Sequence, residues 1–211
     1  MISKVGYSLC WKHWLGNKGV GFEITLADGL VISSENIKGV INRLLSISPN
    51  CLKRVKPDDR NYAQQEFFAF FLSWLYSIPC PILNPPTPQG LSGQWRHISE
   101  WIYLASKAGL PITPYRQGSK IGKADLSRKH ISLPVNTAIV VARYVIGEGI
   151  DSDILKACQR LAELAKTPLL GIDFAFDLMG GLRFIGATPL PDLRLGGERL
   201  LSALASVLLE R

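Results

Sequence analysis

Residues 169–195 constrain the fold of this chain more than any other stretch, because they combine two strand patterns with a turn between them. In residues 170–176 apolar side chains occupy every second position, which is the period of a half-buried β-strand. A Gly-Gly pair then permits a tight turn, and residues 182–188 resume an extended apolar pattern. The stretch predicts an antiparallel hairpin. Asp173 and Asp177 fall on the side opposite the apolar residues, facing whatever the hairpin covers.

The composition is that of a globular protein, with 211 residues, of which 47% are hydrophobic and 19% charged. This length suffices for one large domain or two small ones, and we expect two lobes. No apolar run approaches the ~20 residues that a membrane span needs, and the first residues lack a secretory signal pattern. We therefore expect a cytoplasmic protein with no membrane partner. The four cysteines lie far apart, which favours reduced, buried thiols.

The formal charge of +7 is concentrated in residues 1–150, which hold 17 Lys and Arg against 9 acids, whereas residues 151–211 hold 7 against 8. The densest basic segment is residues 116–130. Such an excess attracts phosphates or acidic partners, and one hypothesis is a nucleic-acid binding module that uses this loop. The alternative is a solvated basic loop. Nucleic acid is the less favoured partner, because the chain has neither a recognition motif nor an array of aromatic side chains for stacking.

The first lobe is predicted to hold short strands and two helices. Residues 20–34 contain two apolar-alternating runs around an Asp-Gly turn, which predicts a hairpin. Residues 35–47 have apolar positions at helical spacing but also β-branched residues, so helix and strand both remain open. Residues 60–78 predict a helix that is apolar on most sides, normally a sign of burial between layers, and that Pro79 ends. A short strand over residues 81–83 follows.

The second helix of this lobe is predicted over residues 94–108, with Ser92 as its N-terminal cap. Gly109 is the expected stop, because glycine readily adopts the left-handed conformation that ends many helices. The side chains of one face should pack on a sheet: Ile98, Trp101, Ile102 and Ala105.

The second lobe begins after a polar, turn-rich loop over residues 112–134. Residues 137–146 are predicted to form one strand, and residues 151–166 an amphipathic helix with acids at its start. The last helix, residues 198–211, should bury one apolar stripe: Leu200, Leu201, Leu204, Ala205 and Leu208.

Taken without further comparison, the residues contain no nucleophile paired with a base, no phosphate-binding loop and no cluster with metal-ligand spacing. The three histidines sit in unrelated segments. Asp173 is a candidate metal ligand, although a single carboxylate is also common on a solvated strand.

Three stretches in order carry a resemblance: ENIKGVINRLL (residues 35–45), PCPILNPPTPQGLSGQWRHISEWIYLASKAGLPIT (79–113) and LAELAKTPLLGIDFAFDLMGGLRFIGATPLPDLRLGG (161–197). Their order and spacing resemble the ATP-grasp family of carboxylate-amine ligases. In the first, the family has an extended segment ending in Asn-Arg, here Asn42-Arg43, which favours the strand. The second resembles the family's strand, "N-x-P" loop and helix, and the third its closing hairpin.

The resemblance implies a Mg²⁺ and ATP site that is weak or lost. In active members a Glu and an Asn on the second strand of the closing hairpin join the Asp of the first strand in holding Mg²⁺ against the ATP phosphates. Here Gly186 and Thr188 occupy those two places, and Asp173 alone is retained. Because hard cations need several oxygen donors, Mg²⁺ should bind much more weakly.

The family also places a β-rich subdomain with nucleotide-gripping lysines in the middle of the chain, for which this sequence leaves about 25 residues between Thr113 and Ala138. Lys120 and Lys123 are the candidates to replace one such lysine.

A further candidate ligand site is the start of the last helix, at Arg194, Gly196 and Gly197. Free amides at a helix N-terminus attract anions, and Arg194 could add a bidentate contact to a carboxylate or phosphate. The alternative is that the glycines only form a tight turn and that Arg194 is solvated.

We therefore expect an α/β (α+β) protein with a shortened ATP-grasp-like fold and a mainly antiparallel C-terminal sheet. The lobes should be residues 1–112 and 137–211, joined by a basic linker over 113–136. The leading function is a catalytically impaired ATP-grasp relative that binds a small ligand or a protein partner. The alternative is an active ATP-dependent ligase completed by a partner chain. A homodimer is plausible, because a shortened middle subdomain would leave an apolar face uncovered.

Overall fold

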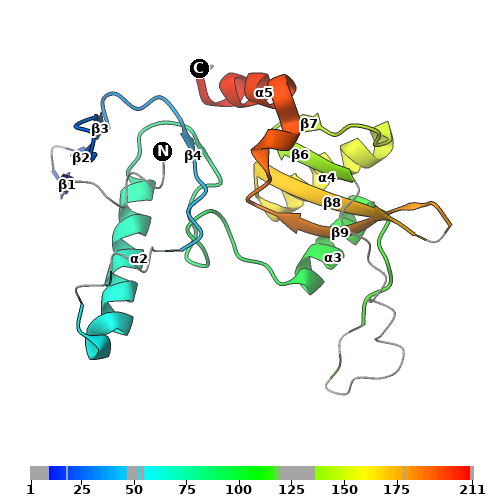
Figure 1. The fold of residues 1–211 in the computed structure, drawn as a ribbon, viewed down its shortest axis with the longest axis horizontal. Coiled ribbons are helices and arrows are strands. Elements are labelled where there is room, and N and C mark those ends of the chain that lie inside the picture. Colours follow the sequence, from blue (N-terminus) through cyan, green and yellow to red (C-terminus); the bar gives the residue numbers. More distant parts are fainter. Residues whose placement is uncertain are drawn as a thin grey trace. The chain divides into compact units, whose positions relative to one another are not determined.

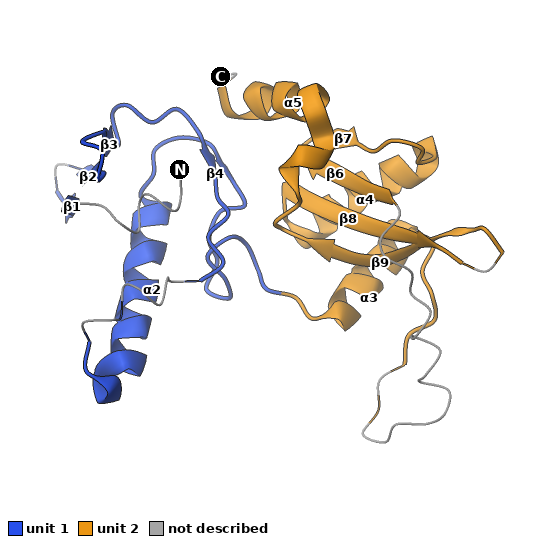
Figure 2. Ribbon diagram, in the orientation of Figure 1, with its two compact units in different colours: residues 1–95, 211 blue, residues 96–210 orange. Residues whose placement is uncertain are grey.

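The computed structural model describes residues 10–17, 19–46, 52, 55–116, 118, 136–177 and 179–209. They form two compact units, one up to Trp95 and one from Arg96 onward (Figures 1 and 2). Among the helices of this described part, none is both long and apolar enough to cross a membrane.

Three strands pair in the described part of unit 1, with β2, Gly19–Thr25, between β1, Cys10–Gly16, and β3, Val31–Ser33. The hairpin predicted over residues 20–34 is confirmed, since β2 and β3 are antiparallel around a turn in which Gly29 has a φ of 83°. The second hairpin, of β1 with β2, was not predicted. The chain from β2 into the turn buries three apolar side chains: Phe22, Ile24 and Leu26.

The choice left open for residues 35–47 is decided in favour of a strand over their described part. Strand β4, Val40–Ile41, pairs in parallel with β5, Ile82–Leu83. The adjacent Asn42 is buried, and its Nδ2 donates hydrogen bonds to the carbonyl oxygens of Asn84 at 2.9 Å and Leu91 at 2.6 Å. A buried amide must find partners, so this side chain ties the loop after β5 to β4.

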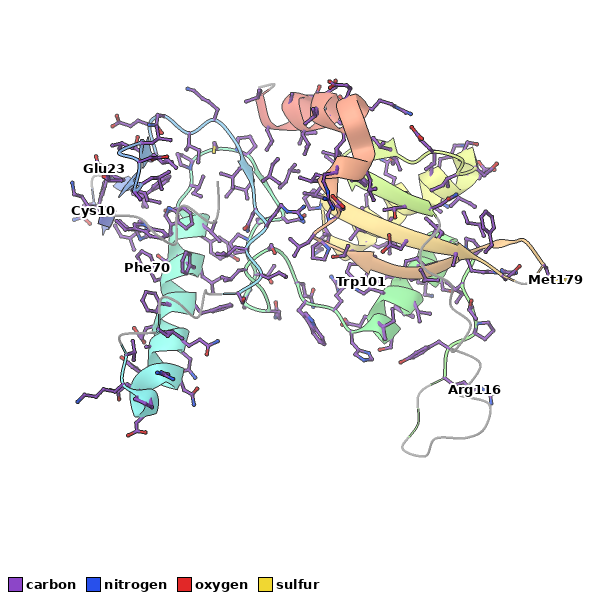
Figure 3. The ribbon with its side chains drawn as sticks, in the orientation of Figure 1. Cys10, Glu23, Phe70, Trp101, Arg116 and Met179 are labelled. Carbon is purple, nitrogen blue, oxygen red and sulfur yellow. The ribbon has the colours of Figure 1, made fainter. Side chains whose placement is uncertain are left out.

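The predicted helix over residues 60–78 is present as α2, Arg60–Tyr76, after a 3₁₀ turn η2, Pro57–Asp59. Although its sequence is apolar on most sides, Phe71 and Leu75 are its fully buried residues in the described structure. Three aromatic side chains of α2 meet Trp11 edge to face, with ring centroids 4.9 to 5.3 Å apart: Phe70, Phe71 and Trp74. Figure 3 labels Phe70 on this helix.

The described residues of unit 2 form a four-stranded antiparallel sheet in the order β7-β6-β8-β9 (Figure 1). The predicted hairpin is confirmed as β8, Leu169–Phe176, and β9, Leu182–Thr188. The half-buried character predicted for its first strand is wrong, because side chains on both faces of β8 are buried as far as Ala175, Asp173 being intermediate. Phe176 then emerges and is half exposed.

The single strand predicted over residues 137–146 is instead a hairpin of β6, Asn136–Val141, and β7, Tyr144–Ile146. Ala142 takes a φ of 50° at the turn, which is unusual for alanine and therefore gave no signal in the sequence. A positive φ at the first central residue is the pattern of a type II′ turn, whose twist suits a two-residue hairpin.

Helix α3, Ile98–Ala108, begins later than predicted because His97, and not Ser92, is its cap. The His97 side chain accepts a hydrogen bond from a first-turn amide, and Glu100 accepts one from the His97 N–H at 3.3 Å. The predicted stop is confirmed, since Gly109 has a φ of 85°.

One face of the sheet is covered by α3 together with α4, Ser152–Ala165, which matches the predicted helix and is capped by Asp151. The predicted apolar face of α3 packs there, with Trp101 directed at the sheet (Figure 3). The core at this face includes residues from both helices and two strands: Trp101, Ala105, Leu161, Leu170, Ile172 and Phe174.

The opposite face is covered at its β6–β7 end by α5, Gly197–Leu209, which follows a 3₁₀ turn, η4, Leu193–Gly196. The stripe predicted for this helix is wrong in part, because Leu201 and Ala205 are exposed. The buried residues are Leu200, Ala203 and Leu204. Leucines lie all round α5, so the sequence left its rotation undetermined and contact with the sheet selects it.

Helix α3 packs with unit 2, whereas we expected it in the first lobe. Arg160 of α4 donates from Nε to the carbonyl oxygen of Ala108 at 2.9 Å, and Arg96 donates to that of Ala165 at 3.0 Å. The compact units accordingly part at Trp95, while the expected lobes part at residue 112.

Candidate functional site

The centre of the expected metal site lies on β8. Asp173 stands opposite Thr137 of β6 and opposite Gly186 of β9, so these three residues share one face of the sheet. The Thr137 hydroxyl donates a hydrogen bond to Oδ1 of Asp173 at 2.7 Å. This bond orients the carboxylate, which is neither buried nor fully exposed.

The two positions that carry metal ligands in the resembling family flank Asp173 on this same face. Thr188 lies opposite Gly171, two residues from the Asp173 pair. A Cβ placed on Gly186 would meet no atom within 4 Å, so the space beside Asp173 is open. A bulge after Asp173 shifts the register of the hairpin, so the pairing on the side of Asp173 differs by one residue from the pairing toward the hairpin tip.

Among the described residues, this arrangement offers few ligands for Mg²⁺, and a metal role for Asp173 stays a prediction. Asp173 supplies one carboxylate, Gly186 supplies no side-chain donor, and the Thr188 hydroxyl oxygen accepts a hydrogen bond from the Leu190 amide at 3.2 Å. Within the described residues no group of three His, Cys, Asp or Glu side chains is placed to hold a metal ion. Mg²⁺ takes six oxygen ligands, several of them waters or phosphates, and proteins usually anchor it through one or two carboxylates; the described part of this face offers only Asp173.

Asp177, the second carboxylate singled out in the sequence, belongs to the turn of the hairpin. Its Oδ2 accepts a hydrogen bond from Nε of Arg183 at 2.7 Å, and its Oδ1 accepts bonds from the Gly181 and Met179 amides at 2.8 and 2.9 Å. The Arg183 contact, followed by the amide bonds, lowers the pKa of Asp177. Met179 lies exposed at the hairpin tip (Figure 3). Asp177 therefore closes a turn, a structural role.

The candidate anion site at the start of α5 is placed as follows. The Arg194 guanidinium forms a bidentate ion pair with Asp192, at 2.9 Å from Nε and 2.6 Å from a terminal nitrogen. Gly196 is buried, and a Cβ there would overlap the Leu200 side chain. Gly197 has a φ of 51° at the first residue of the helix. Packing explains Gly196, and a ligand role for these residues stays a prediction.

Lys120 and Lys123 lie outside the described residues, as does most of the basic segment 116–130. Arg116 at its start is exposed (Figure 3).

One histidine contacts a serine, yet the pair is not built as a base and a nucleophile. Nε2 of His13 lies 3.1 Å from Oγ of Ser77, whose hydroxyl donates to the carbonyl oxygen of Trp74 at 2.7 Å. With the serine proton directed at Trp74, His13 is the donor to Ser77. Burial lowers the pKa of His13, which favours the neutral imidazole, and the donor role places its proton on Nε2.

An open groove of about 420 Å³ lies between β7 and α5, and nothing in the sequence analysis pointed to it. Its walls combine polar side chains with a small apolar floor: Tyr144, Val145, Ile146, Glu198, Arg199, Ser202, Ala203 and Ser206. Tyr144 donates from its hydroxyl to Oγ of Ser206 at 3.3 Å, which joins the strand to the helix. No spacing within either element could reveal the groove, because it arises from their contact.

These features define an α+β protein with an ATP-grasp-like fold. The solved structures similar to it include two that were determined with bound peptides. The macrocyclase MdnC from Microcystis aeruginosa, solved with the precursor peptide MdnA, has a TM-score of 0.71 at 13% identity, over 99% of this chain and 89% of that one. The RiPP-associated ATP-grasp ligase of Chryseobacterium gregarium, solved with ADP and a leader and core peptide, has a TM-score of 0.69 at 14% identity, over 97% and 86%.

A third similar structure is the macrocyclase MdnB from Microcystis aeruginosa, with a TM-score of 0.61 at 16% identity, over 96% of this chain and 83% of that one. No protein-family model matches the sequence, and no curated protein is significantly similar to it. The predicted ATP-grasp-like fold is thus confirmed by structural likeness.

Proposed function

We propose that this chain is an ATP-grasp relative with impaired or absent ligase activity that acts by binding a peptide partner. One observation carries the first half of the proposal. Gly186 stands directly opposite Asp173, where the resembling family has a carboxylate, and the adjacent family Asn is Thr188. Losing two of three metal ligands removes the charge and the donors that hold Mg²⁺ against ATP phosphates.

The second half of the proposal narrows the expected small ligand or protein partner to a peptide. Two similar structures were solved with peptides, so the fold is compatible with peptide recognition. Recognition of a peptide needs no metal, and it therefore survives the loss of the metal ligands.

The test is a calorimetric titration of the purified chain with Mg·ATP, together with an assay for ADP release. We expect no saturable binding at micromolar nucleotide and no ADP release. Asp173→Asn is the matched variant, and it should behave as the parent does.

Micromolar binding that disappears in Asp173→Asn would contradict the proposal and favour the active ligase completed by a partner chain. Micromolar binding that is equal in both proteins would place nucleotide away from Asp173 and would remove the argument from the missing ligands.

A further inference from the structure

The groove between β7 and α5 lies beside an edge of the four-stranded sheet. The sheet order makes β7 and β9 the outer strands. The edge of β9 is partly covered, because Phe184 donates its N–H to the carbonyl oxygen of Pro111 at 2.7 Å and Ile112 forms a parallel bridge with it. The edge of β7 instead borders the open groove.

The register of the hairpin fixes which backbone groups face this edge. Val141 and Tyr144 flank the two-residue turn, and such a flanking pair exchanges both of its hydrogen bonds. The next pair, Val140 with Val145, is therefore a non-hydrogen-bonded pair. The N–H and C=O of Val145 consequently point away from β6, and within the described residues no hydrogen bond reaches them.

The edge lacks the features that normally block strand addition. Residues 144–146 contain no proline, lysine or bulge. A backbone N–H and C=O that no described residue pairs, next to a groove with apolar lining, is the arrangement that accepts an extended peptide as an added strand.

The walls of the groove indicate the side chains that such a peptide would carry. Glu198 and Arg199 line it from the first turn of α5, and neither forms an ion pair with a described residue. Arg199 suits a peptide carboxylate, to which it can bind in a bidentate manner. The lining holds one acid and one base, so the choice of an acidic partner rests on the bidentate contact open to Arg199 and not on the net charge of the chain.

We propose that an extended, acidic peptide segment binds in this groove as an added strand, exchanging backbone hydrogen bonds with Val145 and placing a carboxylate on Arg199. This inference names the site of the peptide partner and so rests on the proposed function. Ser202, on the exposed wall of α5, bounds the space that the peptide would fill.

The experiment begins with selection of linear nine-residue peptides from a displayed random library on the immobilised full chain. The selected peptides are then titrated by fluorescence anisotropy against the parent, Ser202→Trp and Ala205→Trp. Both substitutions lie at exposed positions of α5, but Ala205 does not line the groove. We expect acidic peptides whose affinity falls on the order of 30-fold in Ser202→Trp and changes less than about twofold in Ala205→Trp.

Backbone pairing is tested by methylating each peptide amide nitrogen in turn. The N–H that pairs with Val145 C=O should be the sensitive one, and methylation of its immediate neighbours should have little effect, because alternate amides face away from the edge. Arg199→Glu should weaken the same acidic peptides on the order of 10-fold or more.

The possible failures are distinguishable. If no peptide is enriched, the peptide partner of the proposed function fails, and the groove with it. If enriched peptides bind Ser202→Trp as well as the parent, peptide binding stands but the groove is not its site. If the parent alone forms a dimer that Ser202→Trp dissociates, the occupant is a second copy of the chain and the inference is overturned.

Discussion

On one face of the sheet in unit 2, the space above Gly171 of β8 is filled, whereas the space above Gly186 of β9 is open. The two glycines therefore have different structural roles. Gly171 lies at the covered end, where a Cβ would come within 2.9 Å of Cβ of Pro191. Gly186 lies at the open end, where a Cβ would meet nothing within 4 Å. The first glycine is required by close packing, whereas the second has no steric reason to be glycine. Its effect is to remove a side chain beside Asp173.

The comparison also separates structure from chemistry. At the covered end Pro191 lies over Gly171, and farther across the same face the contact of α5 with β7 leaves a groove. At the open end the polar residues include Thr137 and Asp173, which bond to each other. The Mg²⁺ site expected from the sequence thus lies at the open end, where oxygen donors beside Asp173 are missing among the described residues. The proposed peptide groove lies elsewhere, where α5 meets the edge strand β7.

The largest loss of stability is expected at the other face of the sheet, which packs against α3 and α4. Trp101→Ala should lower the free energy of unfolding by about 3–5 kcal/mol, because this side chain is 5% exposed and packs among both helices and the sheet. Tyr103→Ala on the same helix is the control, and as an exposed residue it should cost about 0.5 kcal/mol or less. Chemical denaturation measures both. Equal losses would show that α3 is rotated relative to this structure.

The comparison itself is tested by adding one methyl group at each end. Gly171→Ala should destabilise the fold by about 1–3 kcal/mol, since Pro191 cannot move without displacing the turn into η4. Gly186→Ala should change stability by less than about 1 kcal/mol and in the stabilising direction, because alanine restricts the unfolded chain and the site is open. Thermal midpoints of the two variants decide the matter, and a larger loss at Gly186 would reverse the assignment of covered and open ends.

The open end can also be used to restore the missing donors. Gly186→Glu with Thr188→Asn should bind Mn²⁺ about tenfold or more tightly than the parent, as followed by electron paramagnetic resonance, because both new side chains share the face of Asp173. Gly186→Ala with Thr188→Ala is the matched control and should bind as the parent does. Equal binding by all three proteins would mean that the missing ligands do not explain the weak site.

The smallest effect on stability is expected at the tip of the β8–β9 hairpin, where the Asp177 carboxylate bonds to the turn amides and to Arg183. The pKa of Asp177 is lowered in the folded protein, so its contribution to stability is present above the unfolded value near 3.8 and is lost as the pH falls through the lower, folded pKa. Asp177→Asn should therefore flatten the dependence of stability on pH below about 4. Denaturation at a series of pH values measures this, and an unchanged profile would show that Arg183 and the turn amides do not stabilise the charged form.

Local sequence determined the elements whose signals are contained in a few neighbouring residues. The alternation in residues 170–176 and the Gly-Gly turn predicted the β8–β9 hairpin, and the Asp-Gly turn predicted β2–β3. Gly109 correctly marked the end of α3, because left-handed backbone favours glycine wherever it occurs. The three resembling stretches likewise predicted the ATP-grasp-like fold, which the similar solved structures share at 13 and 14% identity.

Tertiary structure decided the features for which several local choices have similar energies. Ala142 adopts a positive φ because β6 and β7 pair, and Leu200 rather than Leu201 is buried because the sheet selects one of several apolar stripes on α5. The open space at Gly186 and the groove beside Val145 belong to the same class. Each of these features depends on which segment packs against a strand. Such a contact joins residues far apart in the chain, and no local sequence pattern specifies it.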